Sequence, residues 1–597
     1  MNFFPHDHLR DGQQLMIDAV THAITQKESV LIHAPTGIGK TAAVLAAALP
    51  SLEAHDLTLF FLTSRHTQHE IVNETLRLIR ERHDASLKVA NIIGKKWMCG
   101  QDAVAKMMSA DFHEYCRDLR EQHACTFFEK TLQKGKPTPQ ATVLVSSLQQ
   151  EIATTPRIID HSLKEHQCPY EVSMLLAQKA RIIVTDYFYL FHEPVRNSFL
   201  GKLDKELQKS ILIVDEAHNL SGRIREQMTA RLSEIMLGRA LAEAKKFKER
   251  EAKKGLQLLE RSFNELAHPV KTEEYVQRDD LAVSDDLIDV LEESASRIRT
   301  QQQKSAIGGI AHFTGLWQGQ DEGFTRILSK SNLGTVLSYR CLDPSIEVEP
   351  VLEQSHASIL MSGTLSPTSM YADLLGVKGK QLTLPCPFPP KNRLNLLLPV
   401  ATTRFRDRTL AQYKNIANVC SNVIKEVPGN VLIFFPSYKL MHEITPIIKT
   451  DIPLILERKG KADREATLAE FSSRRSTLAA VSAGSFGEGI DIKNNVIKTV
   501  IVVGLPLSQP NLETKALVNY YDIKYKKGWS YGYVLPAMIK AIQNAGRCIR
   551  SETDKGAIIF LDERYTHPSY FCCFPPEWQL KITRDYQEAL MDFFSKR

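Results

Sequence analysis

The sequence has no apolar run that approaches the roughly 20 residues a membrane-spanning helix needs. Its first residues, MNFFPHDHLRDGQQ, also lack the basic and then apolar pattern of a secretory signal. No internal repeat is present, which argues against a solenoid. We therefore predict a cytoplasmic protein without a membrane partner.

Cysteine is sparse, with 10 residues in 597, and no C-x-x-C pair occurs. This absence argues against a common zinc ribbon, and a reducing compartment argues against disulfides. Four cysteines nevertheless fall in one polar, irregular stretch: Cys99, Cys116, Cys125 and Cys168. From spacing alone, buried thiols and a metal site are equally good interpretations. The other six are scattered, and we interpret them as packing residues.

Neither sign of charge dominates, since the net charge is only +6. Such a mild excess is compatible with a polyanionic partner but is equally common among soluble enzymes. The hydrophobic content of 43% and charged content of 24% are those of an ordinary globular protein. A chain of 597 residues is too long for one core, so we expect several domains.

One glycine is also missing from the most informative stretch, Ser29 to Leu49. A short apolar run leads into APTGIGKT (34–41), and an alanine-rich helical pattern follows. Strand, glycine-rich turn and helix in this order form a phosphate-binding loop, although Ala34 replaces the usual first glycine. Lys40 is predicted to reach the β- and γ-phosphates and Thr41 to ligate Mg²⁺. The backbone of the loop would cradle phosphate oxygens at Thr36, Gly37, Ile38 and Gly39.

A phosphate loop also needs an acidic partner, and DEAH (215–218) supplies one at the end of the apolar run 211–214. Asp215 is predicted to hold Mg²⁺ and Glu216 to orient or deprotonate the attacking water. His218 is predicted to link the nucleotide to the next motif.

Alternating strand and helix patterns predict an α/β protein with two parallel sheets. The first α/β domain is split into residues 1–90, 176–225 and 346–374. An insertion at 91–175 contains the four cysteines, and a second, mostly helical insertion spans 226–345. Residues 375–597 form the second α/β domain.

Near the C-terminus, QNAGRCIR (543–550) falls on a predicted helix over about 536–549. Gln543, Arg547 and Arg550 would share one helix face. Two arginines are too costly to bury without an anion, so we predict that they bind the γ-phosphate of ATP between the two α/β domains.

These motifs, with SGT (362–364) and GSFGEGID (484–491), stand in the order of superfamily 2 helicase motifs. The cysteine stretch, with CTFF (125–128), CPY (168–170) and the following YFYL (187–190), resembles the iron–sulfur domain of the XPD/DinG helicase family. The second insertion lies where that family carries its Arch domain. The resemblance covers nearly the whole chain.

The resemblance implies two RecA-like motor domains with an inserted iron–sulfur domain and a mostly helical Arch-like insertion. It implies an ATP- and Mg²⁺-dependent DNA helicase, in DNA repair or replication, that translocates 5′ to 3′ on single-stranded DNA and opens forked DNA. The expected oligomeric state is a monomer. In a prokaryotic source, the protein would be associated with the nucleoid. The four cysteines would hold a [4Fe–4S] cluster. The resemblance also implies that Gln13 reads the adenine and that Arg65 contacts DNA. Ser362 and Thr364 would couple the nucleotide cleft to the DNA. Gly489 and Asp491 would lie in the cleft loop of the second domain.

A second hypothesis is an iron–sulfur DNA-binding or redox-sensing module whose nucleotide site is vestigial. The intact Lys40, Asp215 and Glu216 and the paired arginines argue against it. DNA-stimulated ATP hydrolysis separates the two hypotheses.

Overall fold

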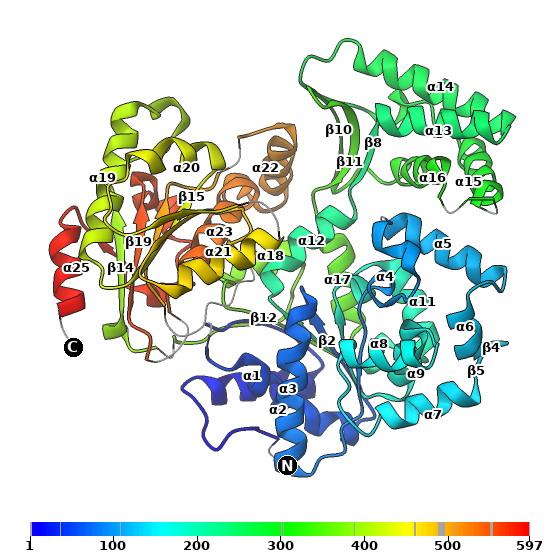
Figure 1. Cartoon of the computed structure of the whole chain (residues 1–597), viewed down its shortest axis with the longest axis horizontal. Helices are drawn as coiled ribbons and strands as arrows, with labels where there is room; N and C mark the ends of the chain where they lie inside the picture. The colour runs from blue at the N-terminus through cyan, green and yellow to red at the C-terminus, as the bar shows by residue number, and fades with distance from the viewer. Residues whose placement is uncertain are drawn as a thin grey trace.

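The computed structural model describes residues 3–35, 37–107, 109–299, 301–302, 304–386, 388–458, 461–487, 496–507, 509–549 and 553–595. Two seven-stranded parallel sheets form two separate α/β domains, and two insertions extend from the first (Figure 1). Within the described ranges, no helix is long and apolar enough to cross a bilayer.

The first sheet has the strand order β13-β1-β12-β7-β2-β6-β3. Its strands are β1 (Ser29–His33), β2 (Thr58–Thr63), β3 (Val89–Asn91), β6 (Ile182–Asp186), β7 (Ser210–Asp215), β12 (Ala357–Ser362) and β13 (Lys380–Thr383). The helices that cover it are α1 (Gln13–Gln26), α2 (Lys40–Ala54), α3 (His66–His83), α10 (Phe188–Phe191), α11 (Glu193–Leu203), α12 (Leu220–Gln227), α17 (Ser345–Gln354) and α18 (Thr368–Leu375). Because β13 pairs with β1, this sheet extends past residue 374.

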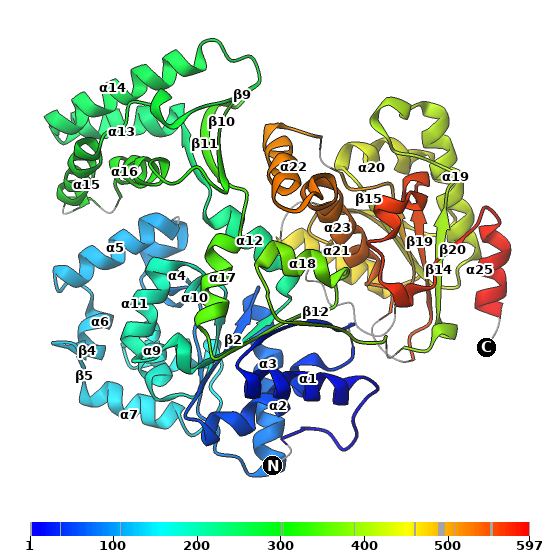
Figure 2. The same ribbon diagram turned by 180° about the vertical axis from the view of Figure 1, so that it is seen from behind.

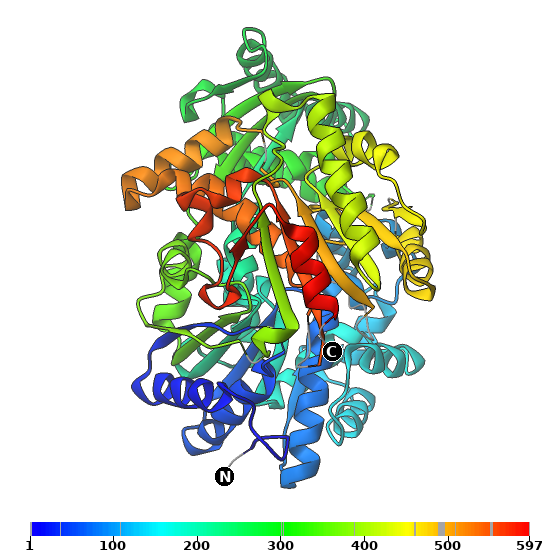
Figure 3. The same cartoon turned by 90° about the vertical axis from the view of Figure 1, so that its left-hand side faces the viewer.

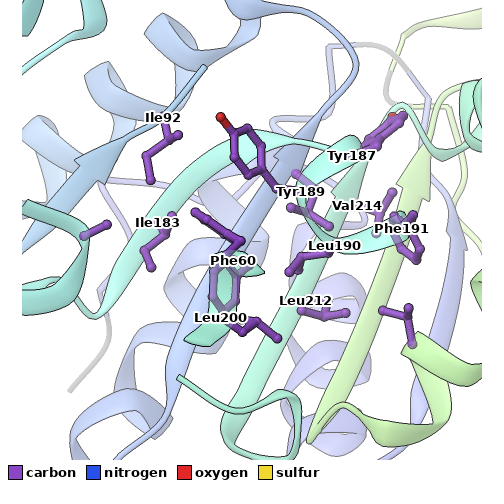
Figure 4. Close-up of a cluster of buried hydrophobic side chains, with 14 of the residues drawn as sticks. Phe60, Ile92, Ile183, Tyr187, Tyr189, Leu190, Phe191, Leu200, Leu212 and Val214 are labelled. Carbon is purple, nitrogen blue, oxygen red and sulfur yellow. The ribbon is translucent and has the colours of Figure 1, made fainter. Parts of the chain in front are cut away.

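Both faces of this sheet are buried, which explains why its strands are continuously apolar. Successive side chains point to opposite faces, so Phe60 and Leu62 join one core and Leu59 and Phe61 the other. The core on the first face combines strand residues such as Phe60, Ile183 and Leu212 with aromatic side chains of the segment that follows β6 (Figure 4).

The cysteine insertion leaves the sheet after β3 and returns to it at β6. It contains α4 (Lys95–Met98), α5 (Ser109–Glu121), α6 (Thr126–Thr131), α7 (Pro139–Leu148), α8 (Thr155–Lys164), α9 (Pro169–Lys179) and the hairpin β4 (Leu132–Gln133) to β5 (Lys136–Pro137). The last helix packs on the first motor-domain core, because Tyr170, Val172 and Leu176 belong to the same buried cluster as Phe60.

The second insertion contains a four-stranded antiparallel sheet that the sequence patterns did not predict. The sheet has the order β8-β11-β10-β9, formed by β8 (Ala230–Ser233), β9 (Glu273–Tyr275), β10 (Phe324–Ser331) and β11 (Gly334–Cys341). Its helices are α13 (Glu234–Lys246), α14 (Arg250–Ala267), α15 (Asp285–Arg299) and α16 (Ala306–Trp317). The helices α13 and α14 do not form one continuous helix, because Lys248 between them has φ of 60°.

The second motor-domain sheet has the order β16-β17-β15-β18-β19-β14-β20. Its strands are β14 (Arg393–Leu398), β15 (Asn430–Phe435), β16 (Leu454–Leu456), β17 (Thr477–Val481), β18 (Ile497–Val503), β19 (Gly556–Leu561) and β20 (Lys581–Ile582). Its helices are α19 (Leu410–Glu426), α20 (Tyr438–Ile444), α21 (Lys461–Ser473), α22 (Leu512–Tyr525), the short π-helix Ser530–Val534, α23 (Leu535–Ala545), α24 (Pro568–Phe571) and α25 (Tyr586–Ser595).

Specific contacts fix the insertions against the rest of the chain. Arg299 at the end of α15 forms an ion pair of 3.2 Å with Glu114 on α5, so the two insertions touch. On the other side, the Tyr275 hydroxyl donates to the Leu512 carbonyl at the start of α22 (2.9 Å). The second insertion therefore contacts the cysteine insertion and the second motor domain, as the view from behind shows (Figure 2). The helix α25 lies on the outside of the second motor domain (Figure 3).

Candidate nucleotide cleft and cysteine cavity

The phosphate loop follows β1 as predicted and ends at the first turn of α2. Gly37 and Gly39 have φ of 84° and 82°, a region that glycine enters without strain. A Cβ on Gly39 would also stand 2.5 Å from the Gln13 amide nitrogen, so any side chain there would displace Gln13. Ile38 is fully buried, and Lys40 and Thr41 begin α2. Thr36 lies outside the described residues.

The N-terminal glutamine lies directly against this loop. Gln13 is buried, accepts a hydrogen bond from the Arg10 backbone N–H (2.7 Å) and donates to the Gly39 carbonyl (3.4 Å). The Arg10 guanidinium donates to the Gly37 carbonyl. Arg10 therefore braces the loop, a role that the sequence patterns did not assign to it.

The acidic pair, Asp215 and Glu216, lies at the carboxyl end of β7, and β12 separates β7 from β1 in the sheet. Glu216 has φ of 52°, a left-handed conformation, and its N–H donates to the Asp215 carboxylate (3.0 Å). The buried Tyr187 hydroxyl hydrogen-bonds to the Asp215 carbonyl and lies 3.0 Å from the Glu216 carbonyl oxygen. Tyr187 thus fixes the strained turn, and sequence reasoning missed this because a tyrosine after a strand carries no recognisable signal.

The pKa values of the Asp215 and Glu216 carboxyl groups are shifted in opposite directions. Burial and the adjacent negative charge of Glu216 raise the pKa of Asp215 to about 7. Burial acts in the same direction on Glu216, but hydrogen bonds from His218 and Ser362 and the charge of Lys40 outweigh it and lower its pKa to about 2. Glu216 is therefore the ionised acceptor at the centre of the cleft.

A hydrogen-bonded chain runs from Glu216 through the SGT motif. The Ser362 hydroxyl donates to the Glu216 carboxylate (2.9 Å) and accepts from the Thr364 backbone N–H (3.2 Å). His218 Nδ1 lies 2.6 Å from the same hydroxyl oxygen and 3.2 Å from the Glu216 carboxylate. Because the single hydroxyl proton goes to Glu216, the Nδ1 atom of His218 carries the proton in this bond.

The chain then crosses to the second motor domain. With Nδ1 protonated, His218 Nε2 accepts from the Gln543 side-chain amide, 2.6 Å away on α23. His218 is buried and Gln543 is half-buried. The predicted link between DEAH and the next motif is thus a direct side-chain contact between the two motor domains.

The predicted helix over 536–549 is too long by several residues. Helix α23 ends at Ala545, and Gly546, a poor helix former, follows it. Arg547 therefore lies in a turn beyond the helix and not, as predicted, on the same helix face as Gln543. Its guanidinium donates to the Gly487 carbonyl (2.9 Å), which brings it to the GSFGEGID loop. Arg550, Gly489 and Asp491 lie outside the described residues.

Glu457 is a further residue of this region that sequence reasoning missed. It follows β16, is 5% exposed, and accepts hydrogen bonds from the backbone N–H groups of Val481 (2.7 Å) and Ser485 (2.6 Å). A buried carboxylate is retained only when its oxygens are paired. Its function is to hold the start of the GSFGEGID loop in place.

The predicted DNA contact Arg65 takes no part in the hydrogen-bonded chain from Glu216 to Gln543; it lies at the N-terminus of α3. The Gln68 side chain accepts a hydrogen bond from the Arg65 backbone N–H (3.1 Å) and caps the helix, and the Arg65 side chain is half-buried. It follows β2, so it lies at the same carboxyl edge of the sheet as the phosphate loop and Asp215.

The four cysteines of the first insertion line one small cavity, in which the space open to a water-sized group is about 20 Å³. They come from the end of α4, from α5, and from the N-caps of α6 and α9, so four separate elements converge. The rest of the lining includes two basic residues, Lys95 and Arg120, and four aromatic ones, Phe112, Phe127, Phe128 and Tyr170. The alternative interpretation of these four cysteines as buried thiols does not explain why all four line one cavity.

Burial raises the pKa of the Cys99 thiol, and burial together with Glu171 raises that of Cys168 to about 12. Neutral thiols are therefore favoured unless a cation is present to stabilise thiolates. Within the described residues, no three His, Cys, Asp or Glu side chains are close enough to hold a single metal ion. A cubane iron–sulfur cluster is held by four cysteines, which is the number that line this cavity.

The two parallel sheets belong to domains that contact each other through His218 and Gln543. Together with the phosphate loop and the acidic strand end, this arrangement defines a nucleotide-dependent motor protein with two domains. Two family models match the chain, one described as DEAD_2 over residues 62–237 and one as Helicase C-terminal domain over residues 420–580. The chain belongs to the XPD/DinG-like superfamily 2 helicases, and the predicted fold class of two RecA-like motor domains is confirmed.

Individual relatives are distant but extend over the whole chain. The ATP-dependent DNA helicase XPD of Sulfolobus acidocaldarius is 24% identical over 93% of this chain and 96% of its own. The general transcription and DNA repair factor IIH helicase subunit XPD of Dictyostelium discoideum is 22% identical over 99% and 91%. A solved structure titled XPD_Helicase has a TM-score of 0.69 at 23% identity and covers 97% of this chain and 100% of its own.

Proposed function

We propose that this protein is an ATP-dependent DNA helicase of the XPD family. The observation that carries this proposal is the hydrogen-bonded chain from Glu216 through His218 to Gln543, which joins the hydrolytic carboxylate to the second motor domain. A vestigial nucleotide site would have no reason to retain a contact that depends on both domains. DNA and helicase activity are also named for the Sulfolobus relative.

In this mechanism ATP binds at the phosphate loop between the two motor domains. Lys40 contacts the β- and γ-phosphates, and Thr41 and Asp215 hold Mg²⁺. Glu216 is ionised and orients the attacking water, while Arg547 and Arg550 engage the γ-phosphate from the other domain. Gln13, against the loop, reads the adenine.

Hydrolysis is coupled to movement because the cleft residues belong to both domains. Loss of the γ-phosphate removes the anion that holds the arginines, so the domains separate and the His218–Gln543 bond is strained or broken. Ser362 and Thr364 transmit this change along β12, and Arg65 holds the DNA backbone. Contacts to the backbone make binding sequence-tolerant and salt-sensitive.

Cys99, Cys116, Cys125 and Cys168 would hold a [4Fe–4S] cluster, because these four thiols line one cavity. When bound, the cluster would crosslink four elements of the insertion into a rigid body. The residues around it exclude water with aromatic side chains, and Arg120 lies over the Phe128 ring at 4.0 Å, which further stiffens the cavity. A rigid insertion beside the first motor domain is suited to separating the strands of a duplex.

We propose 5′ to 3′ translocation on single-stranded DNA, in repair or replication-associated processing, by a monomeric enzyme in the cytoplasm. The test is unwinding of forked, 5′-tailed and 3′-tailed duplexes with ATP, using protein purified anaerobically. Forked and 5′-tailed substrates should be opened and 3′-tailed ones should not. Opening of the 3′-tailed duplex alone would reverse the polarity, and opening of none would overturn the helicase assignment.

A further inference from the structure

The strand that leads into the phosphate loop makes its own contact with the second motor domain, and none of the roles proposed above uses it. His33 is the last residue of β1, directly before the loop, and it is fully buried. Its Nε2 atom lies 3.5 Å from the carboxylate of Glu577, which belongs to the short 3-10 helix Pro576–Trp578 of the second motor domain. A side chain adjacent to the phosphate loop therefore faces a carboxylate of the other domain.

The hydrogen bonds of His33 determine which ring nitrogen carries the proton. Nδ1 accepts from the Leu365 backbone N–H (3.2 Å), so Nδ1 is unprotonated and Nε2 carries the N–H group. The Nε2 atom is buried and has no hydrogen-bond partner among the residues that the structure describes. A buried donor without an acceptor is costly, so a slightly shorter distance to the Glu577 carboxylate would be favourable.

His33 is held firmly within the first motor domain. Leu365, which donates to its ring, directly follows the SGT motif. The His33 carbonyl accepts from the Leu384 N–H (2.9 Å), in the segment that leads from the first sheet to the second. The next residue, Ala34, donates its N–H to the Ser362 carbonyl (2.9 Å). A force on the His33 ring would thus reach both the phosphate loop and the SGT motif.

Glu577 is held as firmly within the second motor domain. Its carbonyl accepts from the Arg393 guanidinium at the start of β14 (2.9 Å), and the following Trp578 is buried in the same core as Phe560. The Glu577 side chain itself is 19% exposed. Because each partner is fixed in its own domain, the distance from His33 Nε2 to the Glu577 carboxylate depends on how the two domains are oriented.

We propose that Glu577 is a positioning residue for ATP binding, whose carboxylate accepts a hydrogen bond from His33 Nε2 when the cleft closes on ATP. This inference rests on the proposed function and extends it to a residue outside the helicase motifs. A distance of 3.5 Å is longer than the roughly 2.7–3.2 Å of a protein N–H···O bond, so a small closure completes the contact. The bond then holds the phosphate loop against the second motor domain and favours the ATP-bound orientation.

The test separates ATP affinity from the chemical step. In Glu577→Ala, the KM for ATP and the dissociation constant of a fluorescent ATP analogue should both rise about five- to tenfold, the effect of one hydrogen bond to a carboxylate. The kcat in the presence of single-stranded DNA should stay within about twofold of wild type, because the bond is present both before and during hydrolysis. ADP lacks the γ-phosphate that closes the cleft, so its affinity should fall less than that of ATP.

Two further variants test the reach of the side chain, which a loss of general stability would not distinguish. Glu577→Gln keeps an acceptor oxygen at the same reach and should retain most of the ATP affinity. Glu577→Asp keeps the charge but is one methylene shorter, so it should resemble Glu577→Ala. Glu588→Ala, at an exposed glutamate of α25 in the same domain, is the matched control and should behave as wild type. Thermal unfolding midpoints verify that each variant is folded.

A double-mutant cycle tests whether Glu577 acts through His33. In His33→Asn, the side-chain oxygen can still accept from Leu365, but the shorter side chain no longer reaches Glu577. Adding Glu577→Ala to this variant should therefore weaken ATP binding little further. The Glu577 series, at a partly exposed side chain, decides the inference by itself if His33→Asn does not fold.

Wild-type ATP affinity in Glu577→Ala, or full additivity in the cycle, would overturn the inference. Equal losses of ATP and ADP affinity would also overturn it, because the pair would then act without closure of the cleft. A wild-type chain that binds no ATP would instead overturn the proposed function.

Discussion

The nucleotide cleft and the cysteine cavity differ in how much of their geometry the polypeptide itself completes. In the cleft, Glu216, His218, Ser362 and Gln543 hydrogen-bond to one another across two domains. In the cavity, the four cysteines face one space without a bond between them, and burial raises the pKa values of Cys99 and Cys168. The cleft is therefore prearranged by protein contacts, whereas in the cavity only the proposed cluster would join the four sulfur atoms.

This difference predicts how each site fails. Removing a side chain from the cleft should leave its neighbours in place and remove one chemical step. Removing a cysteine should release the ligand as a whole and loosen the elements that it joins, because four separate segments converge only there. The predictions that follow test this contrast, beginning with the largest effect.

Lys40→Ala should reduce ATP hydrolysis by at least about 100-fold, because the ammonium group stabilises charge on the transferred phosphoryl group. Binding of single-stranded DNA should survive, since the loop lies in the cleft rather than on the proposed DNA surface. The measurement is steady-state phosphate release beside fluorescence anisotropy with a labelled oligonucleotide. Normal turnover in this variant would sink the assignment of the phosphate loop.

Cys116→Ser should lose bound iron and reduce duplex unwinding by at least about tenfold, since the loss of even an outer-shell partner of a metal site costs about that much. ATP hydrolysis should fall far less, because the nucleotide cleft is built from other elements. Iron content, visible absorption and unwinding are measured on anaerobic protein. Cys572→Ser, at an exposed cysteine outside the cavity, is the control. An iron-free protein that unwinds at the wild-type rate would refute the role of the insertion.

The cleft was largely predictable because its local patterns are strong. Val30–Ile32 followed by Gly37, Gly39 and Lys40 predicts strand, turn and helix within 20 residues, and DEAH follows a second apolar run. Partners that are distant in sequence were not predictable: His218 and Gln543 are 325 residues apart, and only the fold brings them to 2.6 Å. The β8–β11 sheet was missed because helices separate its strands: β9 lies between α14 and α15, and β8 and β10–β11 flank the helical segment. The contact of Arg547 with Gly487 was not predictable, because it depends on α23 ending at Ala545. The periodicity of the sequence predicted that the helix continues to residue 549.

A double-mutant cycle tests whether the bridge between the domains acts as one unit. His218→Ala and Gln543→Ala should each slow DNA-stimulated ATP hydrolysis, and the double variant should be little worse than either one. The expected coupling energy is about 1–2 kcal/mol, typical of a hydrogen bond within a network. Pairing Gln543→Ala with Asn422→Ala, where Asn422 bonds Tyr586 on the far side of the second domain, should instead be additive. Additivity in the first cycle would show that the bridge does not couple the domains.

The base of the second insertion offers a third kind of site, fully hydrogen-bonded but without proposed chemistry. Asp343 is 2% exposed and accepts from Lys524 and Tyr520 of α22, each at 2.6 Å, so it joins the insertion to the second motor domain. Asp343→Asn should lower the free energy of unfolding by about 1–3 kcal/mol, because Lys524 loses its charged partner. ATP hydrolysis should change less than in the cleft variants.

The pH dependence of this loss distinguishes an ion pair from simple packing. Burial alone would raise the pKa of Asp343, but hydrogen bonds from Lys524, Tyr520 and Ser345 outweigh it and lower the pKa. Because the folded-state pKa lies below the ordinary value of about 3.9, the stabilisation is complete above that value and is lost as the pH falls through the folded-state pKa. The stability difference between wild type and Asp343→Asn should thus be constant near neutral pH and shrink only in acid. Asp160→Asn, at an exposed pair with Lys164, is the control and should leave denaturant unfolding unchanged. A difference that is independent of pH down to the acid transition would mean that Asp343 acts by shape rather than by charge.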